Sequence, residues 1–92
     1  MKIKSLLILP FLLASLQAAT VNDLTFTLNG DNTEYSVTGC GPNASGSLII
    51  PSTYNGLPVT SIGQLAFNNC SFLEIVTIPD SVTVIADYAF QY

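Results

Sequence analysis

Two short strings decide the fold: Leu48-Ile49-Ile50-Pro51 and, further along the chain, Val76-Thr77-Ile78-Pro79. In each string apolar residues alternate with an outward position, and each string ends at a proline. This alternation predicts a β-strand with one buried face. Proline lacks the N–H group that a central strand needs, so it predicts where each strand ends. Self-similarity of this kind is typical of a repeat architecture.

Further landmarks recur at fixed spacing. The first pair is 28 residues apart and the other two are 23 apart: Ile50 with Ile78, Ile62 with Ile85, and Phe67 with Phe90. The difference, 28 − 23 = 5 residues, is an insertion in the first copy, Tyr54-Asn55-Gly56-Leu57-Pro58, whose glycine and proline indicate a turn. The repeat unit is therefore 23 residues long.

A second apolar pair follows each strand, and after it we expect one helical turn. The pairs are Val59 with Ile62 and Val82 with Ile85; the helical turns cover residues 64–68 and 87–90. Turns of this length are unstable alone, so packing must hold their phenylalanines. In a coiled solenoid Phe67 and Phe90 would stack as one internal column.

The segment before the repeats predicts a β-hairpin. Residues 24–28 and 35–38 each alternate between apolar and polar positions, and residues 29–33 read as the turn between them. The first coil of a solenoid has no upstream neighbour, so we expect this hairpin to cover its apolar end. Residues 39–46 then form the loop that joins this cap to the first coil.

The N-terminus resembles a secretory signal. Lys2 and Lys4 precede an uncharged apolar run of 11 residues, 6–16, and Gln17-Ala18-Ala19 supplies small residues for cleavage. The run is too short to span a bilayer, which takes roughly 20 residues, but suits a signal peptide. We expect cleavage after Ala18, or after Ala19, and hence a secreted or cell-surface protein; a buried core helix is the alternative. The predicted divisions are residues 1–18, 19–46 and 47–92, the last with repeats at 47–70 and 71–92.

Charge excludes one class of partner. The 92 residues hold 6 acidic and 2 basic side chains, Lys2 and Lys4, and no histidine. Removal of the signal would leave no cation, so binding to nucleic acid through phosphate neutralisation is excluded.

Composition also argues against catalysis. Without histidine or a mature lysine, Ser–His–Asp, Cys–His, Ser–Lys and Schiff-base sites cannot be built. Asp80 and Asp87 are a conceivable carboxylate pair, but solvated turn and cap roles suit them better. We therefore expect no enzyme, no catalytic residue, no cofactor and no metal site.

Two cysteines, Cys40 and Cys70, are too few for a zinc site. A disulfide is open to an exported chain, and a free buried thiol or a reactive thiol are the alternatives. Asn43-Ala44-Ser45 and Asn69-Cys70-Ser71 match the pattern of glycosylation acceptors, a common chance match.

The residues from Leu48 to Phe90, 43 of the 92, resemble the BspA-type leucine-rich repeat of bacterial and protist surface proteins. The strings that carry the resemblance are Leu-Ile-Ile-Pro, Asn-Gly-Leu-Pro-Val-Thr-Ser-Ile-Gly and Ala-Phe-Asn-Asn-Cys, followed by residues 73–82 and Ala89-Phe90. The preceding residues 36–39 resemble the usual lead-in of such proteins. The resemblance implies a secreted or surface-displayed solenoid that binds other proteins or host matrix. It also implies that Cys70 packs inside the coil as a free thiol.

The chain departs from the family pattern in two places. Ile85-Ala86 stands where the pattern has Ile-Gly, which fits only if the backbone there has negative φ. Tyr92 falls where the pattern continues with a further coil, so the chain resembles a truncated array.

The expected fold is a leucine-rich-repeat solenoid, a right-handed β/α coil rich in strands with short helical turns, preceded by the hairpin cap. We expect binding to an extracellular protein or glycan through outward strand residues in two rows: Ile49 and Thr77; Thr60, Ser61, Thr83 and Val84. Equally, these are solvent-facing residues of high β-propensity, and the chain is then a purely structural fragment of a longer array. An exposed C-terminal edge is expected to allow self-association, and is formed by Val82, Ile85, Ala89 and Phe90.

Overall fold

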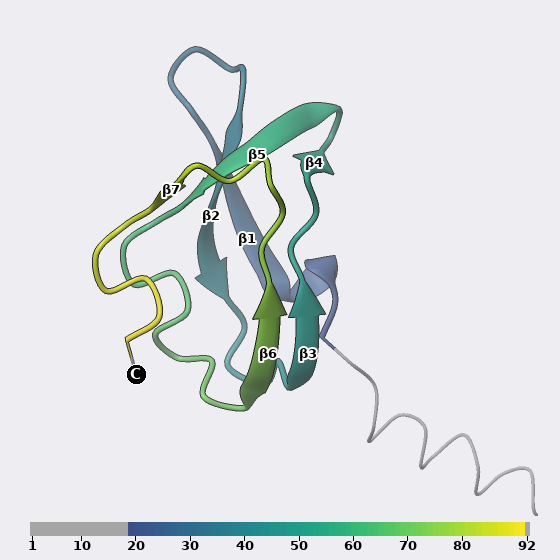
Figure 1. Ribbon diagram of the computed structural model, residues 1–92, viewed down its shortest axis with the longest axis vertical. Coiled ribbons are helices and arrows are strands. Elements are labelled where there is room, and N and C mark those ends of the chain that lie inside the picture. The colour runs from purple at the N-terminus through teal and green to yellow at the C-terminus, as the bar shows by residue number, and fades with distance from the viewer. Residues whose placement is uncertain (1–18, 92) are drawn as a thin grey trace, which may run out of the picture.

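The computed structural model describes residues 19–91, so the predicted signal peptide lies outside the described residues. A short 3-10 helix and seven strands follow one another along the chain (Figure 1): η1 (Val21–Asp23), β1 (Leu24–Leu28), β2 (Tyr35–Cys40), β3 (Gly46–Ile49), β4 (Thr53–Tyr54), β5 (Leu57–Ile62), β6 (Leu73–Thr77) and β7 (Val84–Ile85). Within residues 19–91 no helix is long and apolar enough to cross a membrane.

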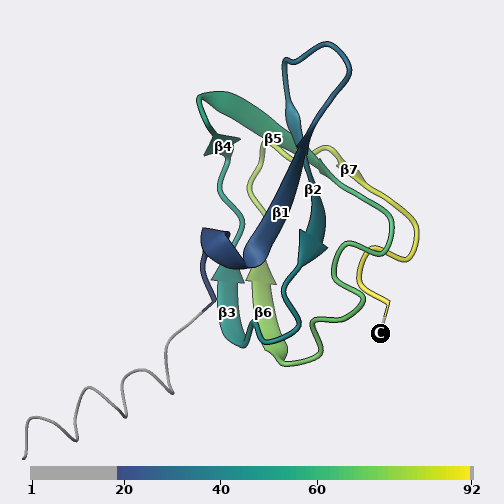
Figure 2. The same ribbon diagram turned by 180° about the vertical axis from the view of Figure 1, so that it is seen from behind.

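Strands β1 and β2 form the predicted antiparallel hairpin, with Leu28 opposite Tyr35. Asn29 organises its turn: the side-chain Oδ1 accepts hydrogen bonds from the backbone N–H groups of Thr33, at 2.8 Å, and Glu34, at 3.2 Å. An asparagine that bonds the backbone of its own turn is a common turn builder. The hairpin lies at the back of the molecule in Figure 1 and at the front in Figure 2.

The two predicted repeats wind into two coils joined by parallel strand pairs. Strand β3 pairs with β6, with Ile49 opposite Thr77, and β5 pairs with β7, with Ser61 opposite Val84 and Ile62 opposite Ile85. The first register joins residues 28 apart and the second joins residues 23 apart, which are the two spacings read from the sequence. The insertion therefore lies between two strands that both keep their partners in the next coil.

The insertion forms a small hairpin of its own. Strand β4 turns back onto the start of β5, with Tyr54 opposite Leu57. Between them, Asn55 and Gly56 have φ of 51° and 83°. A two-residue Asn-Gly turn with both φ positive suits the right-handed twist of the strands that it joins.

This small hairpin also contacts the N-terminal hairpin. The ring of Tyr54 stacks on Phe26 of β1 with centroids 3.9 Å apart, and Tyr35 of β2 meets Tyr54 edge-on at 5.0 Å. The second copy has no such insertion and no such contact to make. The extra residues of the first coil thus serve its junction with the hairpin.

One hydrophobic interior runs through both coils. The rings of Phe67 and Phe90 stack with centroids 4.8 Å apart and planes 6° apart, as the repeat spacing predicts. The backbone N–H of Phe67 donates to the carbonyl of Ala89 at 2.8 Å. The residues buried in this core are Val37, Ala44, Leu48, Ile50, Val59, Ile62, Ala66, Phe67, Cys70, Leu73 and Ala89.

The prediction of helical turns over residues 64–68 and 87–90 is wrong. Both segments are runs of tight turns, with N–H groups bonding three residues back, as Asn68 does to Leu65 and Gln91 to Tyr88. Leu65 and Tyr88 have φ of 60° and 61°, the left-handed conformation, which cannot continue a right-handed helix. Ala86 is not among the residues of positive φ, so alanine fits where the family pattern has glycine.

Candidate binding surface

The outer side of the two-stranded sheet β3–β6 is an exposed, mainly apolar face. Leu48 points inward and is fully buried, whereas Ile49, the next residue, is 70% exposed. On β6, Ile75 is 59% exposed. Pairing places Ser47 beside Ile75 and Ile49 beside Thr77, so the two isoleucines are diagonal neighbours. We call this surface the outer face; it consists of Ser47, Ile49, Ile75 and Thr77.

Of the outer face, the sequence predicted only Ile49 and Thr77. Ile75 was missed although it lies two residues before Thr77, and alternation along a strand puts such residues on one side. Glu74 is also exposed, for a different reason. Gly46 pairs with Leu73 but Ser47 pairs with Ile75, so Glu74 is the extra residue of a β-bulge.

The second predicted row lies on another sheet, that of β2, β5 and β7, and is partly occupied by the N-terminal hairpin. The Thr60 hydroxyl donates a hydrogen bond to Glu34 Oε1, and the Ser61 hydroxyl is hydrogen-bonded to that of Ser36. Both hydroxyls belong to half-buried residues. Thr60 and Ser61 therefore face the hairpin strand rather than a free surface.

The other two members of that row, Thr83 and Val84, remain exposed, Val84 at 57%. The Thr83 N–H donates to the carbonyl of Thr60 at 2.9 Å, which ties the second coil to the first. The structure thus brings Thr83 and Val84 together, apart from the sheet that carries Ile49 and Thr77.

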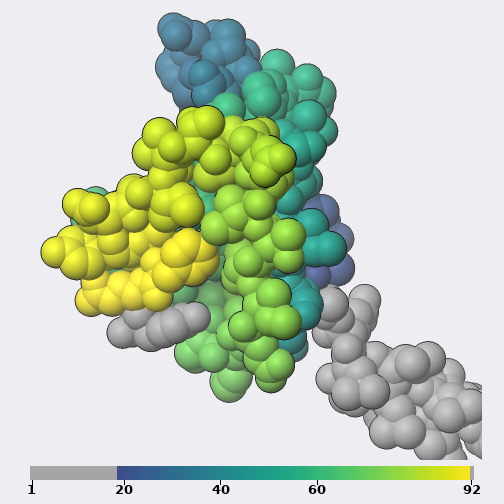
Figure 3. Space-filling view, in the orientation of Figure 1, coloured from purple at the N-terminus to yellow at the C-terminus, as the bar shows by residue number. Residues whose placement is uncertain are grey.

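The predicted C-terminal edge needs one correction. Ile85 is 49% exposed and Val82 and Phe90 are half-buried, but Ala89 is only 2% exposed. Ala89 is buried because it packs into the core beside the first coil and its carbonyl accepts the N–H of Phe67. In Figure 3 the second coil, coloured light green to yellow, forms most of the face in view.

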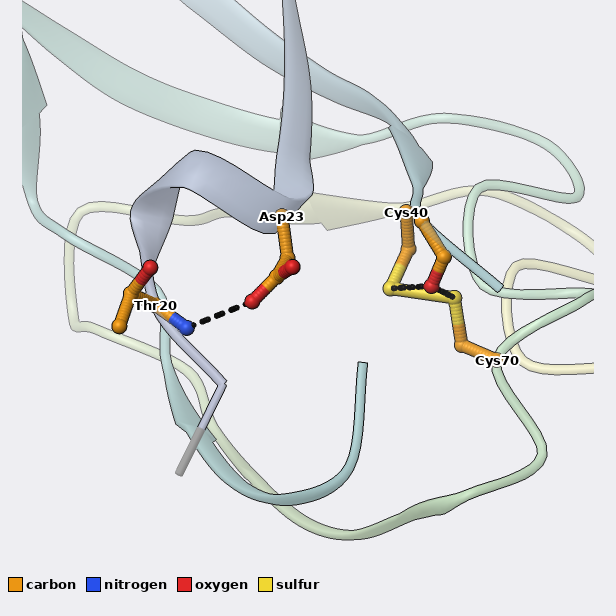
Figure 4. The surroundings of a disulfide bond; sticks show 5 residues. Thr20, Asp23, Cys40 and Cys70 are labelled. Carbon is orange, nitrogen blue, oxygen red and sulfur yellow. Dashed lines mark hydrogen bonds between the residues drawn. A yellow bond between two sulfur atoms is a disulfide. The ribbon is translucent and has the colours of Figure 1, made fainter. Parts of the chain in front are cut away.

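Cys40 and Cys70 are joined by a disulfide bond, with their Cα atoms 6.3 Å apart (Figure 4). The free thiol that the family resemblance implied for Cys70 is thus replaced by the bonded alternative, although Cys70 is fully buried as that resemblance implied. The bond links the end of β2 to the segment that follows Phe67. It therefore ties the N-terminal hairpin to the first coil.

A second link at the hairpin base was not read from the sequence. Thr20 begins η1 as a reciprocal cap: its N–H donates to Asp23 Oδ2 at 2.9 Å, and its hydroxyl accepts from Asn22 N–H at 3.2 Å (Figure 4). The spacing of Thr20 and Asp23 is the signal that a capping box leaves in a sequence. The carbonyl of Asp23 then accepts the N–H of Gly41 at 2.7 Å.

The acidic residues of the second coil stand apart from any recognisable catalytic arrangement. Asp80 and Asp87 are both exposed and lie in separate turns. Among residues 19–91 no three histidine, cysteine or acidic side chains are grouped so that they could hold a metal ion.

Comparisons with known proteins agree with this architecture. Residues 43–92 match the family model described as "BspA type Leucine rich repeat region (6 copies)". The crystal structure of a leucine-rich repeat protein from T. pallidum is similar, with a TM-score of 0.70 and 28% sequence identity. That similarity covers 80% of this chain and 34% of the solved chain, so this chain corresponds to about a third of that protein. No curated protein sequence matches the chain significantly.

Proposed function

Because this chain belongs to the BspA-type leucine-rich repeat family, we propose that it is an exported module that binds another protein through its outer face. Repeats of this family are typical of protein-interaction modules, and proteins of this kind are typically secreted or displayed at the surface and not enzymes. Repeat solenoids present extended surfaces to their partners.

The observation that carries the proposal is the exposure of two adjacent aliphatic side chains on a rigid sheet. Ile49 and Ile75 are 70% and 59% exposed, while the neighbouring Leu48 is fully buried. Single exposed apolar residues are ordinary, but apolar residues gathered on one face are typical of interaction sites. The outer face is built on paired strands, so a partner would meet a surface that is already ordered.

Export supports the proposal from the other end of the chain. Residues 1–18, outside the described part, have the composition of a signal peptide. If the 92-residue chain is made in a secreting host, we expect the released protein to begin at Ala19, or at Thr20 for the alternative site. N-terminal sequencing of the secreted protein measures this, and a released chain that keeps Met1 would contradict cleavage.

The N-terminal hairpin has a structural part in this module, as a cap. Its strand β2 pairs with β5 in parallel, its Val37 is fully buried, and the Val37 carbonyl accepts the N–H of Gly63 at 2.8 Å. A terminal repeat needs such a cover to keep its apolar side from water. The cap leaves the outer face of β3–β6 free for a partner.

Binding is tested with purified extracellular matrix proteins and a glycan array. We expect at least one protein ligand, and the double variant Ile49→Ser with Ile75→Ser should bind it about tenfold more weakly. Leu28→Ser, which changes an exposed residue of the hairpin, is the control and should bind as the parent does. Equal binding by both variants would contradict the proposal.

Two other outcomes of this experiment carry meaning. Binding to glycans alone, still lost in the double variant, would keep the outer face and change the class of ligand. Absence of binding to every member of the panel would contradict the proposal. It would favour the alternative that the chain is purely a structural part of a longer array.

A further inference from the structure

Charge is distributed unevenly over the repeats. Residues 43–70, which make up the loop before β3 and the first coil, carry no charged side chain. The carboxylates of the repeat region, Glu74, Asp80 and Asp87, all belong to the second coil and are all exposed. Residues 19–91 contain no lysine, arginine or histidine.

One of these carboxylates lies at the margin of the outer face. Glu74 is the extra residue of the bulge in β6, directly before Ile75. Leu73 on its other side is buried, at 8% exposure, while Glu74 and Ile75 are both exposed. The bulge therefore brings a carboxylate out beside an apolar contact residue that would otherwise have no charged neighbour on this strand.

A partner that covers Ile75 must also remove water from around Glu74. An unpaired carboxylate that loses its water is costly, and an opposite charge with good hydrogen bonds offsets that cost. The described chain has no cation to offer. The compensating charge has to come from the partner.

From this we infer that the outer face takes a protein segment with lysine or arginine set next to aliphatic side chains, an inference that rests on the proposed function. The aliphatic groups would pack on Ile49 and Ile75, and the cation would pair with Glu74. Arginine suits this position well, because its planar guanidinium bonds a carboxylate in two places. A second copy of the chain is a poor occupant, since it brings only more carboxylates to the contact.

A random peptide library, displayed on phage and selected against the full immobilised chain, tests the inference. We expect the selected peptides to be rich in lysine or arginine beside leucine, isoleucine or valine. Their affinity for Glu74→Gln should be about fivefold lower than for the parent. High salt should reduce their affinity for the parent more than for this variant.

Asp31→Asn is the matched control, because it removes one negative charge from the hairpin turn at the opposite end of the molecule from β3 and β6 (Figure 1). It should leave peptide affinity unchanged. Peptides without enrichment in cations, or peptides that bind Glu74→Gln as well as the parent, would overturn the inference. Equal loss in Asp31→Asn and Glu74→Gln would also overturn it, since net charge alone would then explain the effect.

The variant Ile49→Ser with Ile75→Ser separates this inference from the proposed function. If peptides bind that variant as well as the parent, the outer face itself is wrong. If they lose affinity for it but ignore Glu74→Gln, the face stands and only the choice of a basic partner fails.

Discussion

At the scale of single residues, Phe67 and Phe90 show how position along the stack changes what one side chain contributes. Phe67 is 1% exposed because the second coil lies over it, and its ring stacks on that of Phe90. Phe90 occupies the same place in the next coil but is only half-buried. Burial of apolar area is the main stabilising contribution of such residues, so the two positions should differ in cost when truncated.

We therefore predict that Phe67→Ala lowers the free energy of unfolding by about 3–5 kcal/mol. Phe90→Ala should lower it by less, about half as much, because that ring already contacts water. Urea unfolding followed by circular dichroism measures both changes. A larger loss for Phe90→Ala than for Phe67→Ala would contradict the order of burial.

At the scale of elements, three connections hold the N-terminal hairpin to the first coil: strand pairing of β2 with β5, the aromatic contacts of Tyr54, and the disulfide from Cys40 to Cys70. They come from different parts of the sequence and contact different parts of the hairpin. Removal of one should weaken the junction without abolishing it.

Tyr54→Ala tests the aromatic connection. Aromatic pairs contribute about 0.5–1.5 kcal/mol each beyond the area they bury, and Tyr54 makes two, so we expect a loss of about 2 kcal/mol in unfolding free energy. Tyr88→Ala is the matched control, since Tyr88 is 62% exposed, and should cost clearly less. Thermal unfolding of the two variants side by side gives the comparison, and equal losses would argue against a role for the insertion.

The disulfide is tested by replacing both cysteines with alanine. The bond closes a stretch of 30 residues, and closure of a loop of that size typically stabilises a protein by about 2–4 kcal/mol. We expect a loss of that order, and a similar loss for the parent in reductant. Mass spectrometry under native conditions should find no free thiol in the parent. Two free thiols in the secreted protein would contradict the bond.

Much of this level of structure could be predicted from the residues. Alternation and proline marked the repeat strands, and the spacings of 28 and 23 gave the registers of both parallel pairs. The turns after β5 and β7 could not be predicted, since leucine and tyrosine rarely adopt positive φ and nothing local in the sequence marks Leu65 and Tyr88. Whether Cys40 and Cys70 bond was also hidden, because it depends on how close the fold brings residues 30 apart.

The candidate site was only partly predictable for similar reasons. Ile49 and Thr77 follow from alternation, and so would Ile75. Thr60 and Ser61 are outward on their strand, yet β2 lies beside them, and their hydroxyls bond to Glu34 and Ser36 of that region. Pairing between segments that are distant in sequence decides which outward residues stay free.

At the scale of the whole molecule, the chain is capped on one side and open on the other. Its second coil exposes apolar residues whose counterparts in the first coil are buried: Ile85 is 49% exposed, while Ile62 is fully buried. Stacked repeats usually need about three units for independent stability. Two coils with one open side are therefore expected to be marginal.

We predict that the 92-residue chain on its own unfolds at low temperature or self-associates through Val82, Ile85 and Phe90. Sedimentation velocity at increasing protein concentration measures association, and Ile85→Ser should shift the population towards monomer. A sharp unfolding transition of a monomer at high temperature would contradict this prediction.

The central claim is that two successive coils share one interior, with Phe67 lying on Phe90. Nuclear Overhauser effects between the ring protons of these residues, in a chain with selectively labelled phenylalanine, test it most directly. At a centroid separation of 4.8 Å, we predict strong cross-peaks between the two rings. Well-resolved signals from both rings without any cross-peak between them would contradict the account.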